Sequence, residues 1–221
     1  MSGLFNTLLK TNETDWNRYI QHSFIRQLGD GSLSRASFEH YLKQDYVFLV
    51  HFARAFGLAA FKSSSIKELQ HAKAMMAGIM DVELGLHVQY CQEWGISQEV
   101  LDGITESTAN MAYTRYVMER GLAGDLLDLN VALAPCIVGY AETAKWLSTQ
   151  AFLKTDDNPY LPWLEMYASD EYQEVANAHR AMLDETDVLT LSSQRLQALN
   201  VNFGSATRLE VDFWQMGLDI T

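Results

Sequence analysis

Apolar residues recur at spacings of three and four along almost the whole chain, which places them on one face of an α-helix. No run of β-branched residues alternates convincingly with polar ones, so strands are not expected. The pattern predicts an all-α fold with about seven or eight helices. Because no linker, composition shift or internal repeat divides the 221 residues, we expect a single helical-bundle domain over residues 1–221.

Glycine, proline and capping residues set the boundaries of the predicted helices. Gly29–Gly31 should end the first helix, Ser34 should cap the second, and Pro135 should kink the fifth. Ser192 or Ser193 is expected to cap the last. The expected helices before that cap cover about residues 13–28, 35–61, 66–94, 105–120, 125–147, 160–168 and 170–185.

Composition and charge indicate a protein with a large core and no affinity for nucleic acid. Hydrophobic residues make up 48% of the chain and charged residues only 20%, which suits one large core. With 16 Lys and Arg against 28 Asp and Glu, the net charge of −12 opposes binding to phosphate backbones. The longest weakly charged apolar run, residues 126–139, is shorter than the roughly 20 residues of a membrane span. No signal-peptide pattern opens the chain, so we expect a cytoplasmic protein.

Asp45 is the first residue that suggests chemistry, because it interrupts the apolar stretch LKQDYVFLVHFARAF. A buried carboxylate must find hydrogen-bond donors. One interpretation is a carboxylate that orients a ligand. The alternative is an aspartate at the helix surface or one that caps a neighbouring helix.

The two cysteines, Cys91 and Cys136, are too few for a disulfide framework and form no CxxC motif. Cys136 follows Pro135 and lies four residues before Tyr140, so the thiol and the phenol should share a helix face. An isolated cysteine in an apolar helix is usually a small buried hydrophobe. That interpretation fits Cys91 and stays open for Cys136.

Glu210, in the segment TRLEVDFWQMG, should lie on the same helix face as Phe213 and Trp214. Aromatic surroundings would raise the pKa of its carboxyl group and suit it to acid–base catalysis. The alternative is a salt bridge with Arg208 or with a neighbouring helix.

A metal site is an alternative for any helical bundle, since paired Glu-x-x-His motifs hold two metal ions in such folds. The candidate ligands are Glu68 and His71, Glu83 and His87, and Glu142 and His179. Only the first pair has the Glu-x-x-His spacing. Glu83 and His87 are therefore interpreted as a solvated or locally bonded helical pair.

Five blocks resemble the TenA family, the thiaminase II or aminopyrimidine aminohydrolase group. They occur in the family's order from about residue 15 to the C-terminus, and they read QDYVFLVHFARAFGLAAFKS, AYTRYVM, ALAPCIVGYAE, PYLPWLEMYASDEY and LEVDFWQMG. The resemblance implies a haem-oxygenase-like all-α fold without haem, a homotetramer, and a role in thiamin salvage. The implied reaction deaminates 4-amino-5-aminomethyl-2-methylpyrimidine to the 5-hydroxymethyl product or releases that product from thiamin.

The resemblance also assigns roles to residues of this chain. The catalytic cysteine of the family falls on Cys136, its pyrimidine-binding aspartate on Asp45 and its catalytic glutamate on Glu210. The pocket aromatics fall on Phe48, Tyr113, Tyr140 and Tyr167. Many relatives have a tyrosine at the position of Phe48, which keeps the stacking surface but has no hydroxyl group.

The expected mechanism adds the Cys136 thiolate to the electron-poor pyrimidine ring, with Glu210 as acid and base. It needs no metal or organic cofactor, and its partner is a small aminopyrimidine or thiamin. Two other functions remain open: a metal-dependent oxidase on the same fold, and a non-enzymatic pyrimidine-binding or regulatory protein.

Overall fold

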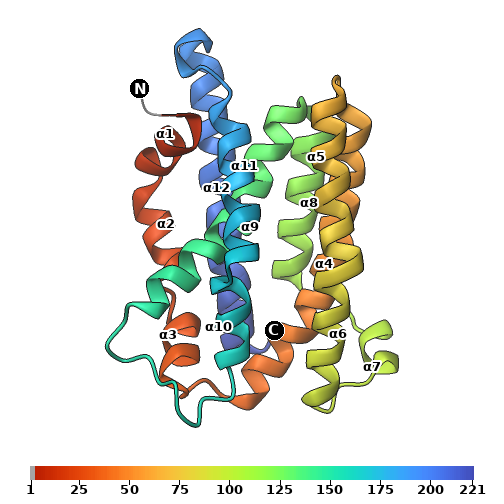
Figure 1. The fold of residues 1–221 in the computed structure, drawn as a ribbon, viewed down its shortest axis with the longest axis vertical. Coiled ribbons are helices and arrows are strands. Elements are labelled where there is room, and N and C mark those ends of the chain that lie inside the picture. Colours follow the sequence, from red (N-terminus) through yellow and green to blue (C-terminus); the bar gives the residue numbers. More distant parts are fainter. Residues whose placement is uncertain (1–2) are drawn as a thin grey trace. The chain divides into compact units, whose positions relative to one another are not determined.

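The computed structural model describes residues 3–221, and the regular structure within them is helical. The helices carry the labels α1 to α12 in Figure 1, and no strand occurs in the described part of the chain. The prediction of an all-α fold is therefore confirmed. The structure divides several of the predicted helices into shorter segments.

The contacts divide the chain into two compact units. The first unit comprises Met1–Leu33 and Asn130–Gln215, and the second comprises Ser34–Leu129 and Met216–Thr221. Two helices, α9 (Leu126–Ser148) and α12 (Ser193–Asp219), contain residues of both units.

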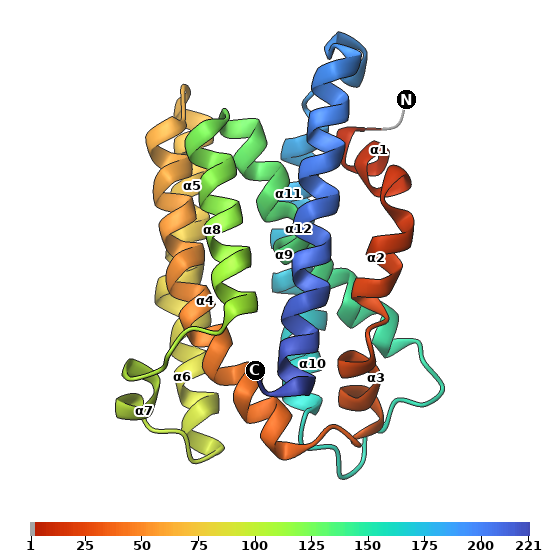
Figure 2. The ribbon, with the colours of Figure 1, turned by 180° about the vertical axis from the view of Figure 1, so that it is seen from behind.

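In the second unit, helix α4 is the element against which the others pack. Figure 2 shows α4 beside α5, α6 and α8, and each of these pairs is in contact. The elements of this unit are α4 (Arg35–Lys62), α5 (Ile66–Ala77), a π-helical turn (Gly78–Glu83), α6 (Leu84–Glu93), α7 (Gln98–Asp102) and α8 (Thr108–Ala123). The buried residues of α4 include Asp45 and Phe48, so this packing places the candidate residues of α4 in the core of the unit.

The first unit is built around stacked aromatic rings. The Phe24 ring stacks on Trp214 with centroids 5.2 Å apart, and Trp16 stacks on Phe203 at 5.5 Å. These side chains are buried, and such pairs stabilise a core beyond the area that they bury. The elements are α1 (Leu4–Thr11), α2 (Glu13–Ile20), α3 (Ser23–Asp30), α10 (Leu161–Ala168), α11 (Asp170–Asp184), a 3₁₀ turn (Val188–Thr190) and most of α9 and α12.

The prediction of a single helix over about residues 13–28 is wrong, because the helix is interrupted between α2 and α3. His22 caps α3, and its ring Nδ1 accepts a hydrogen bond from the N–H of Phe24 at 3.2 Å. The side chain thus satisfies a backbone donor that a new helix start leaves open. The short helices α1 and α7 are absent from the sequence prediction.

The other boundaries follow the predicted signals more closely. Ser34 caps α4 as expected, and the predicted end of α6 is confirmed by Gly95, which has φ +81°. Helix α8 begins three residues later than predicted because Ser107 caps it. The Ser192 hydroxyl accepts from the N–H of Arg195 at 3.1 Å and so caps the last helix.

Pro135 lies inside α9, which continues through it from Leu126 to Ser148. The kink expected there stays a prediction. Among residues 3–221, the structure contains no helix whose length and apolar character would let it cross a membrane.

Replacing Gly139 by alanine should lower the free energy of unfolding by about 1–3 kcal/mol, since the added Cβ would overpack the core of the first unit. That Cβ would lie 2.1 Å from Cε1 of the buried Tyr19. Urea denaturation measures the change. As a control, a Cβ on Gly57 in α4 meets nothing within 4 Å, so Gly57→Ala should raise stability by up to about 1 kcal/mol. Equal effects of the two changes would contradict the packing described for Gly139.

Candidate functional site

Asp45 is buried in the middle of α4, with 3% of its surface exposed. One turn earlier on the same helix, the Tyr41 hydroxyl donates to Asp45 Oδ2 at 3.4 Å. The ring Nδ1 of His87 on α6 lies 3.4 Å from the same oxygen. The alternative of a surface aspartate is therefore wrong, and the carboxyl group has the polar partners that burial requires.

Burial shifts the ionisation of three groups in this cluster. It raises the pKa of Asp45 to about 7, against the smaller lowering effect of the Tyr41 hydrogen bond. Burial, with a smaller contribution from the negative charge of Asp45, raises the pKa of Glu83 to about 8. Burial also lowers the pKa of His87 to about 4. In mildly acidic solution the cluster is therefore mostly uncharged, which avoids the cost of isolated charges in the core.

Two aromatic side chains lie close to Asp45 in sequence and in the packing of the second unit. Phe48, one turn after Asp45 on α4, stacks on Tyr113 of α8 with centroids 5.2 Å apart and an interplanar angle of 28°. Phe52, one turn further, stacks on Phe48 at 5.5 Å. The second unit thus combines a buried carboxyl group with stacked rings, a set of groups suited to a flat polar heterocycle.

The residue before Asp45 fixes the position of α8 against α4. The Gln44 amide donates to the carbonyl oxygen of Thr105 at 3.0 Å and accepts from the N–H of Ser107 at 2.9 Å. The Asn110 amide donates to the carbonyl oxygen of Gln44 at 2.8 Å. These three bonds hold the start of α8, so they position the helix that carries the stacked tyrosine.

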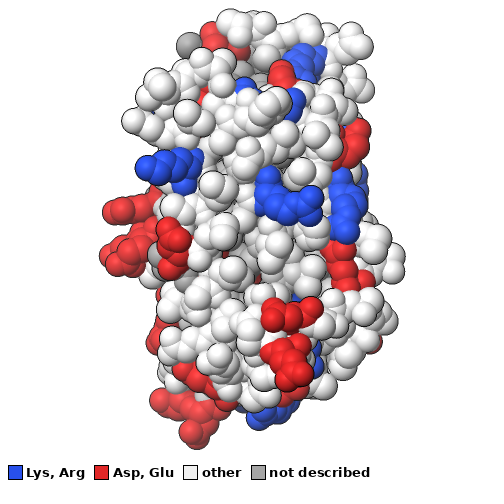
Figure 3. Space-filling model, turned by 90° about the vertical axis from the view of Figure 1, so that its right-hand side faces the viewer, with Lys and Arg blue, Asp and Glu red and all other residues white. Residues whose placement is uncertain are grey.

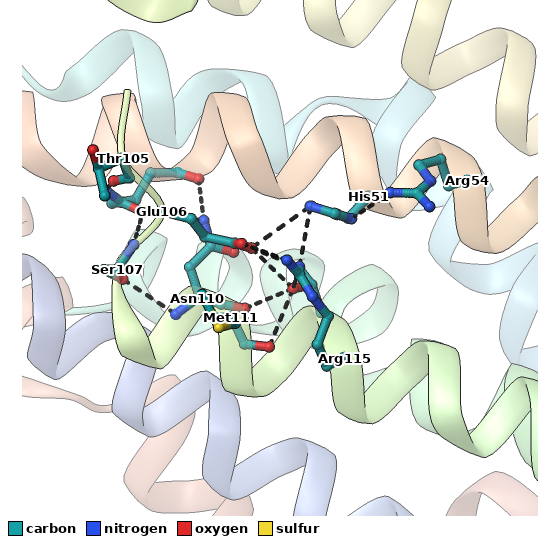
Figure 4. Close-up of polar contacts among 10 residues, drawn as sticks. His51, Arg54, Thr105, Glu106, Ser107, Asn110, Met111 and Arg115 are labelled. Atoms are coloured by element: carbon teal, nitrogen blue, oxygen red, sulfur yellow. Dashed lines mark hydrogen bonds and ion pairs between the residues drawn. The ribbon is translucent and has the colours of Figure 1, made fainter. Parts of the chain in front are cut away.

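A second polar cluster ties the same two helices together, as Figure 4 shows. Arg115 of α8 donates to both carboxylate oxygens of Glu106 at 2.9 and 2.7 Å. His51 of α4 places Nε2 3.6 Å from Glu106 and 3.1 Å from Arg115. A two-bond arginine–carboxylate pair restricts orientation as well as distance. It therefore reinforces the register that Gln44 sets.

In the first unit, Cys136 and Tyr140 lie one turn apart on α9, as the spacing predicts. Cys136 is buried with 7% exposed. The Tyr140 ring lies 4.8 Å from Tyr167 and 5.1 Å from Trp214, measured between centroids. Tyr140 and Tyr167, two of the predicted pocket residues, are therefore brought together.

The other cysteine is fully buried on α6 in the second unit. Burial, with a smaller contribution from the charge of Asp45, raises the pKa of the Cys91 thiol to about 12. A thiol with a raised pKa is a poor nucleophile at neutral pH. The structure therefore agrees with the prediction that Cys91 is a packing residue.

Glu210 lies on α12 with 1% of its surface exposed, and Phe213 and Trp214 of the same helix are also buried. Arg208, the salt-bridge partner considered from the sequence, pairs with Asp15 at 2.9 Å. The alternative of a salt bridge between Glu210 and Arg208 or a neighbouring helix stays a prediction.

The candidate residues fall into two groups. Asp45, Phe48 and Tyr113 belong to the second unit, and Cys136, Tyr140, Tyr167 and Glu210 belong to the first.

Sequence reasoning missed the polar residues around Asp45. His87 was interpreted with Glu83 as a solvated or locally bonded pair, but it is buried and its Nε2 lies 2.8 Å from the Leu42 carbonyl oxygen. The four-residue spacing of Tyr41 and Asp45 was the signal for their contact.

The remaining metal-ligand candidates have structural partners. Glu68 accepts from the N–H groups of Ser64 and Ser65 and caps α5. Glu142 pairs with Arg180 at 2.7 Å. Within residues 3–221, no group of three or more His, Cys, Asp and Glu side chains is arranged to hold a metal ion.

Comparisons with known proteins agree with the resemblance. The model of the TENA/THI-4/PQQC family matches residues 10–220. A Haemophilus influenzae protein named only as uncharacterized is 39% identical, with 98% of this chain and 100% of that protein covered. An aminopyrimidine aminohydrolase from Halalkalibacterium halodurans is 35% identical, with 91% of this chain and 89% of that protein covered.

Solved structures give the same fold. A TenA family transcription regulator from a Silicibacter species has a TM-score of 0.91 and 42% identity, with 97% of this chain and 96% of that chain covered. A domain of unknown function with a heme oxygenase-like fold from Shewanella denitrificans has a TM-score of 0.72 at 15% identity, over 98% of this chain and 92% of that chain. The prediction of a haem-oxygenase-like fold is confirmed.

The desolvated carboxyl groups of Asp45 and Glu83 make stability depend on pH. Unfolded Asp and Glu lose their protons near 3.8 and 4.5, whereas folded Asp45 and Glu83 keep theirs to about 7 and 8. The folded state binds more protons in this interval, so these groups lower the free energy of unfolding as pH rises. His87 acts oppositely between about pH 4 and 6.5, where the unfolded imidazole is the better base.

Asp45→Asn should therefore become more stable relative to the wild type as pH rises from about 4 to about 7, because asparagine resembles the protonated carboxyl and does not ionise. Denaturant unfolding across this range measures the difference. Asp102→Asn, at an exposed position of the same unit, is the control for the chemical change itself. A constant difference between Asp45→Asn and the wild type would contradict the uncharged state of Asp45.

Proposed function

Because the chain belongs to the TENA/THI-4/PQQC family, we propose that it is a hydrolase of thiamin salvage that acts on aminopyrimidines. The proposed reaction converts 4-amino-5-aminomethyl-2-methylpyrimidine and water into the 5-hydroxymethyl product and ammonia. The buried Asp45 beside the stacked Phe48 and Tyr113 carries this proposal, because an aminopyrimidine needs both a flat apolar surface and a hydrogen-bond acceptor. The name of the Halalkalibacterium relative supports the substrate class.

We assign recognition to the aromatic residues and to Asp45. The rings of Phe48, Tyr113, Tyr140 and Tyr167 hold the flat pyrimidine. Asp45 accepts a hydrogen bond from the exocyclic amino group at the edge of the ring.

Cys136 is the proposed nucleophile. Its thiolate forms a C–S bond with the pyrimidine ring, and the electron pair moves outward to break the bond between the exocyclic methylene and nitrogen. Glu210 protonates the leaving amine, which departs as ammonia, and then takes a proton from water as the water adds to the methylene. The C–S bond then breaks and returns the thiolate. The reaction consumes one water molecule and releases one ammonia, and Cys136 and Glu210 return to their starting protonation states.

We further propose that residues 1–221 act as one catalytic domain in a cytoplasmic homotetramer, as the family resemblance implies. The proposed partner is a small molecule and not a nucleic acid. On the face shown in Figure 3, Lys and Arg side chains form small groups with Asp and Glu between them and no continuous basic surface. The net charge of −12 also opposes binding to nucleic acid.

Cys136→Ala should reduce the turnover of 4-amino-5-aminomethyl-2-methylpyrimidine by about 100-fold or more, because it removes the nucleophile. Ammonia release under steady-state conditions measures the loss. Cys91→Ala is the matched control, since it makes the same change at the buried packing cysteine, and it should keep near wild-type turnover. Full turnover by Cys136→Ala would rule out the covalent mechanism, and thiamin assayed in parallel would report whether it is also cleaved.

Glu210→Gln should lower kcat by roughly 10²–10⁴-fold, the usual contribution of a general acid or base. Glutamine keeps the shape of the side chain, so the product should still bind, and isothermal calorimetry with the hydroxymethyl product checks this. Glu165→Gln, at an exposed position of α10, is the control and should leave kcat unchanged. If Glu210→Gln kept its kcat, Glu210 would not be the acid–base group.

A further inference from the structure

The ring of His87 is held in one tautomer by a backbone carbonyl group. Its Nε2 lies 2.8 Å from the carbonyl oxygen of Leu42. A carbonyl oxygen can only accept, so Nε2 carries the hydrogen. In the neutral ring, Nδ1 then presents a lone pair and can only accept.

That lone pair faces Asp45. Nδ1 lies 3.4 Å from Asp45 Oδ2, and the exposed fractions of the two side chains are 7% and 5%. Two lone pairs at this contact would repel each other, so one proton must lie between the nitrogen and the oxygen. It belongs either to an imidazolium paired with a carboxylate or to a carboxylic acid that donates to a neutral ring.

The surroundings favour the neutral pair. Burial disfavours both charges, and it shifts the pKa of Asp45 upward and that of His87 downward. Glu83 adds a second carboxyl group whose interaction with a charged Asp45 is repulsive. The proton therefore resides on Asp45 Oδ2 and points at His87, while the Tyr41 hydroxyl donates to the same oxygen.

The position of this proton determines whether the other carboxyl oxygen of Asp45, Oδ1, can donate or only accept a hydrogen bond. A neutral carboxyl group without a fixed partner can present its O–H from either oxygen, so it can face a ligand as donor or as acceptor. With the proton engaged by His87, Oδ1 can only accept. It can accept a hydrogen bond from the N–H of an exocyclic amino group, but it repels the oxygen of an oxo group at the same position.

On the basis of the function proposed above, we propose that His87 is a positioning residue that fixes the proton of Asp45 and thereby makes the site select 4-aminopyrimidines over 4-oxopyrimidines. The amino group donates to Oδ1, whereas an oxo group would place two acceptors together. A mispaired polar group in a buried site is costly, so one such contact supports strong discrimination.

The test uses two variants of His87 that separate its two nitrogens. Glutamine can keep the donor to Leu42 but loses the acceptor toward Asp45, and asparagine does the reverse. Calorimetry with 4-amino-5-hydroxymethyl-2-methylpyrimidine and its 4-oxo analogue gives a ratio of dissociation constants for each protein. His87→Gln should reduce the wild-type preference for the amino compound about 10-fold or more, and His87→Asn should restore it to within about threefold.

His179→Gln is the matched control, since His179 is also buried and its Nε2 lies 3.0 Å from a backbone carbonyl oxygen, that of Asn130. It should keep the wild-type ratio, which a general loss of packing would not explain. If the wild type prefers the amino compound and His87→Gln keeps that ratio, the role of His87 is overturned while the proposed function stands. If the wild type binds neither compound, the proposed function and the selectivity both fail.

Nitrogen-15 NMR of the histidine rings in the ligand-free protein tests the proton position without any substrate. At about pH 6, where Asp45 is largely protonated and His87 is neutral, His87 should appear as a ring with hydrogen on Nε2 and a hydrogen-bonded Nδ1. A doubly protonated His87 at that pH would overturn the inference, whatever the protein hydrolyses.

Discussion

The burial of one carboxyl group in the middle of α4 is the constraint on which the site depends. A charge at Asp45 would be costly in the core, so the side chain remains largely protonated below about pH 7 and is bonded by Tyr41. His87 completes this environment from α6. Tyr41 and His87 thus supply the polar contacts that allow α4 to keep an aspartate among aromatic residues.

Two polar clusters hold α8 against α4 near Asp45. Gln44 bonds to the chain around Ser107, and the bonds between Glu106 and Arg115 reinforce the same contact. The stacked Phe48 and Tyr113 rings depend on this register. Before α6, the π-helical turn Gly78–Glu83 adds a residue to the helical turn and so rotates the residues that follow it. The side chain of His87 faces α4 beyond this turn, as its contact with Leu42 shows.

Helical periodicity was sufficient to predict the all-α fold, and caps such as Ser34 set several boundaries correctly. It could not predict the break before α3, because that start is capped by a histidine, which is an uncommon choice. Asp45 stood out because a carboxylate breaks an apolar pattern. His87 did not, because its partners Leu42 and Asp45 lie more than 40 residues away along the chain and only tertiary packing brings them together. The single domain over residues 1–221 stays a prediction.

The most direct measurement is the ionisation of Asp45 itself, followed by carbon-13 NMR of protein labelled at the aspartate side-chain carboxyl carbon, with Asp45→Asn to assign the signal. The account predicts a signal that titrates near pH 7 in the ligand-free protein and moves when 4-amino-5-hydroxymethyl-2-methylpyrimidine binds. An Asp45 signal that titrates near pH 4, or one that the pyrimidine leaves unchanged at saturation, would contradict the account.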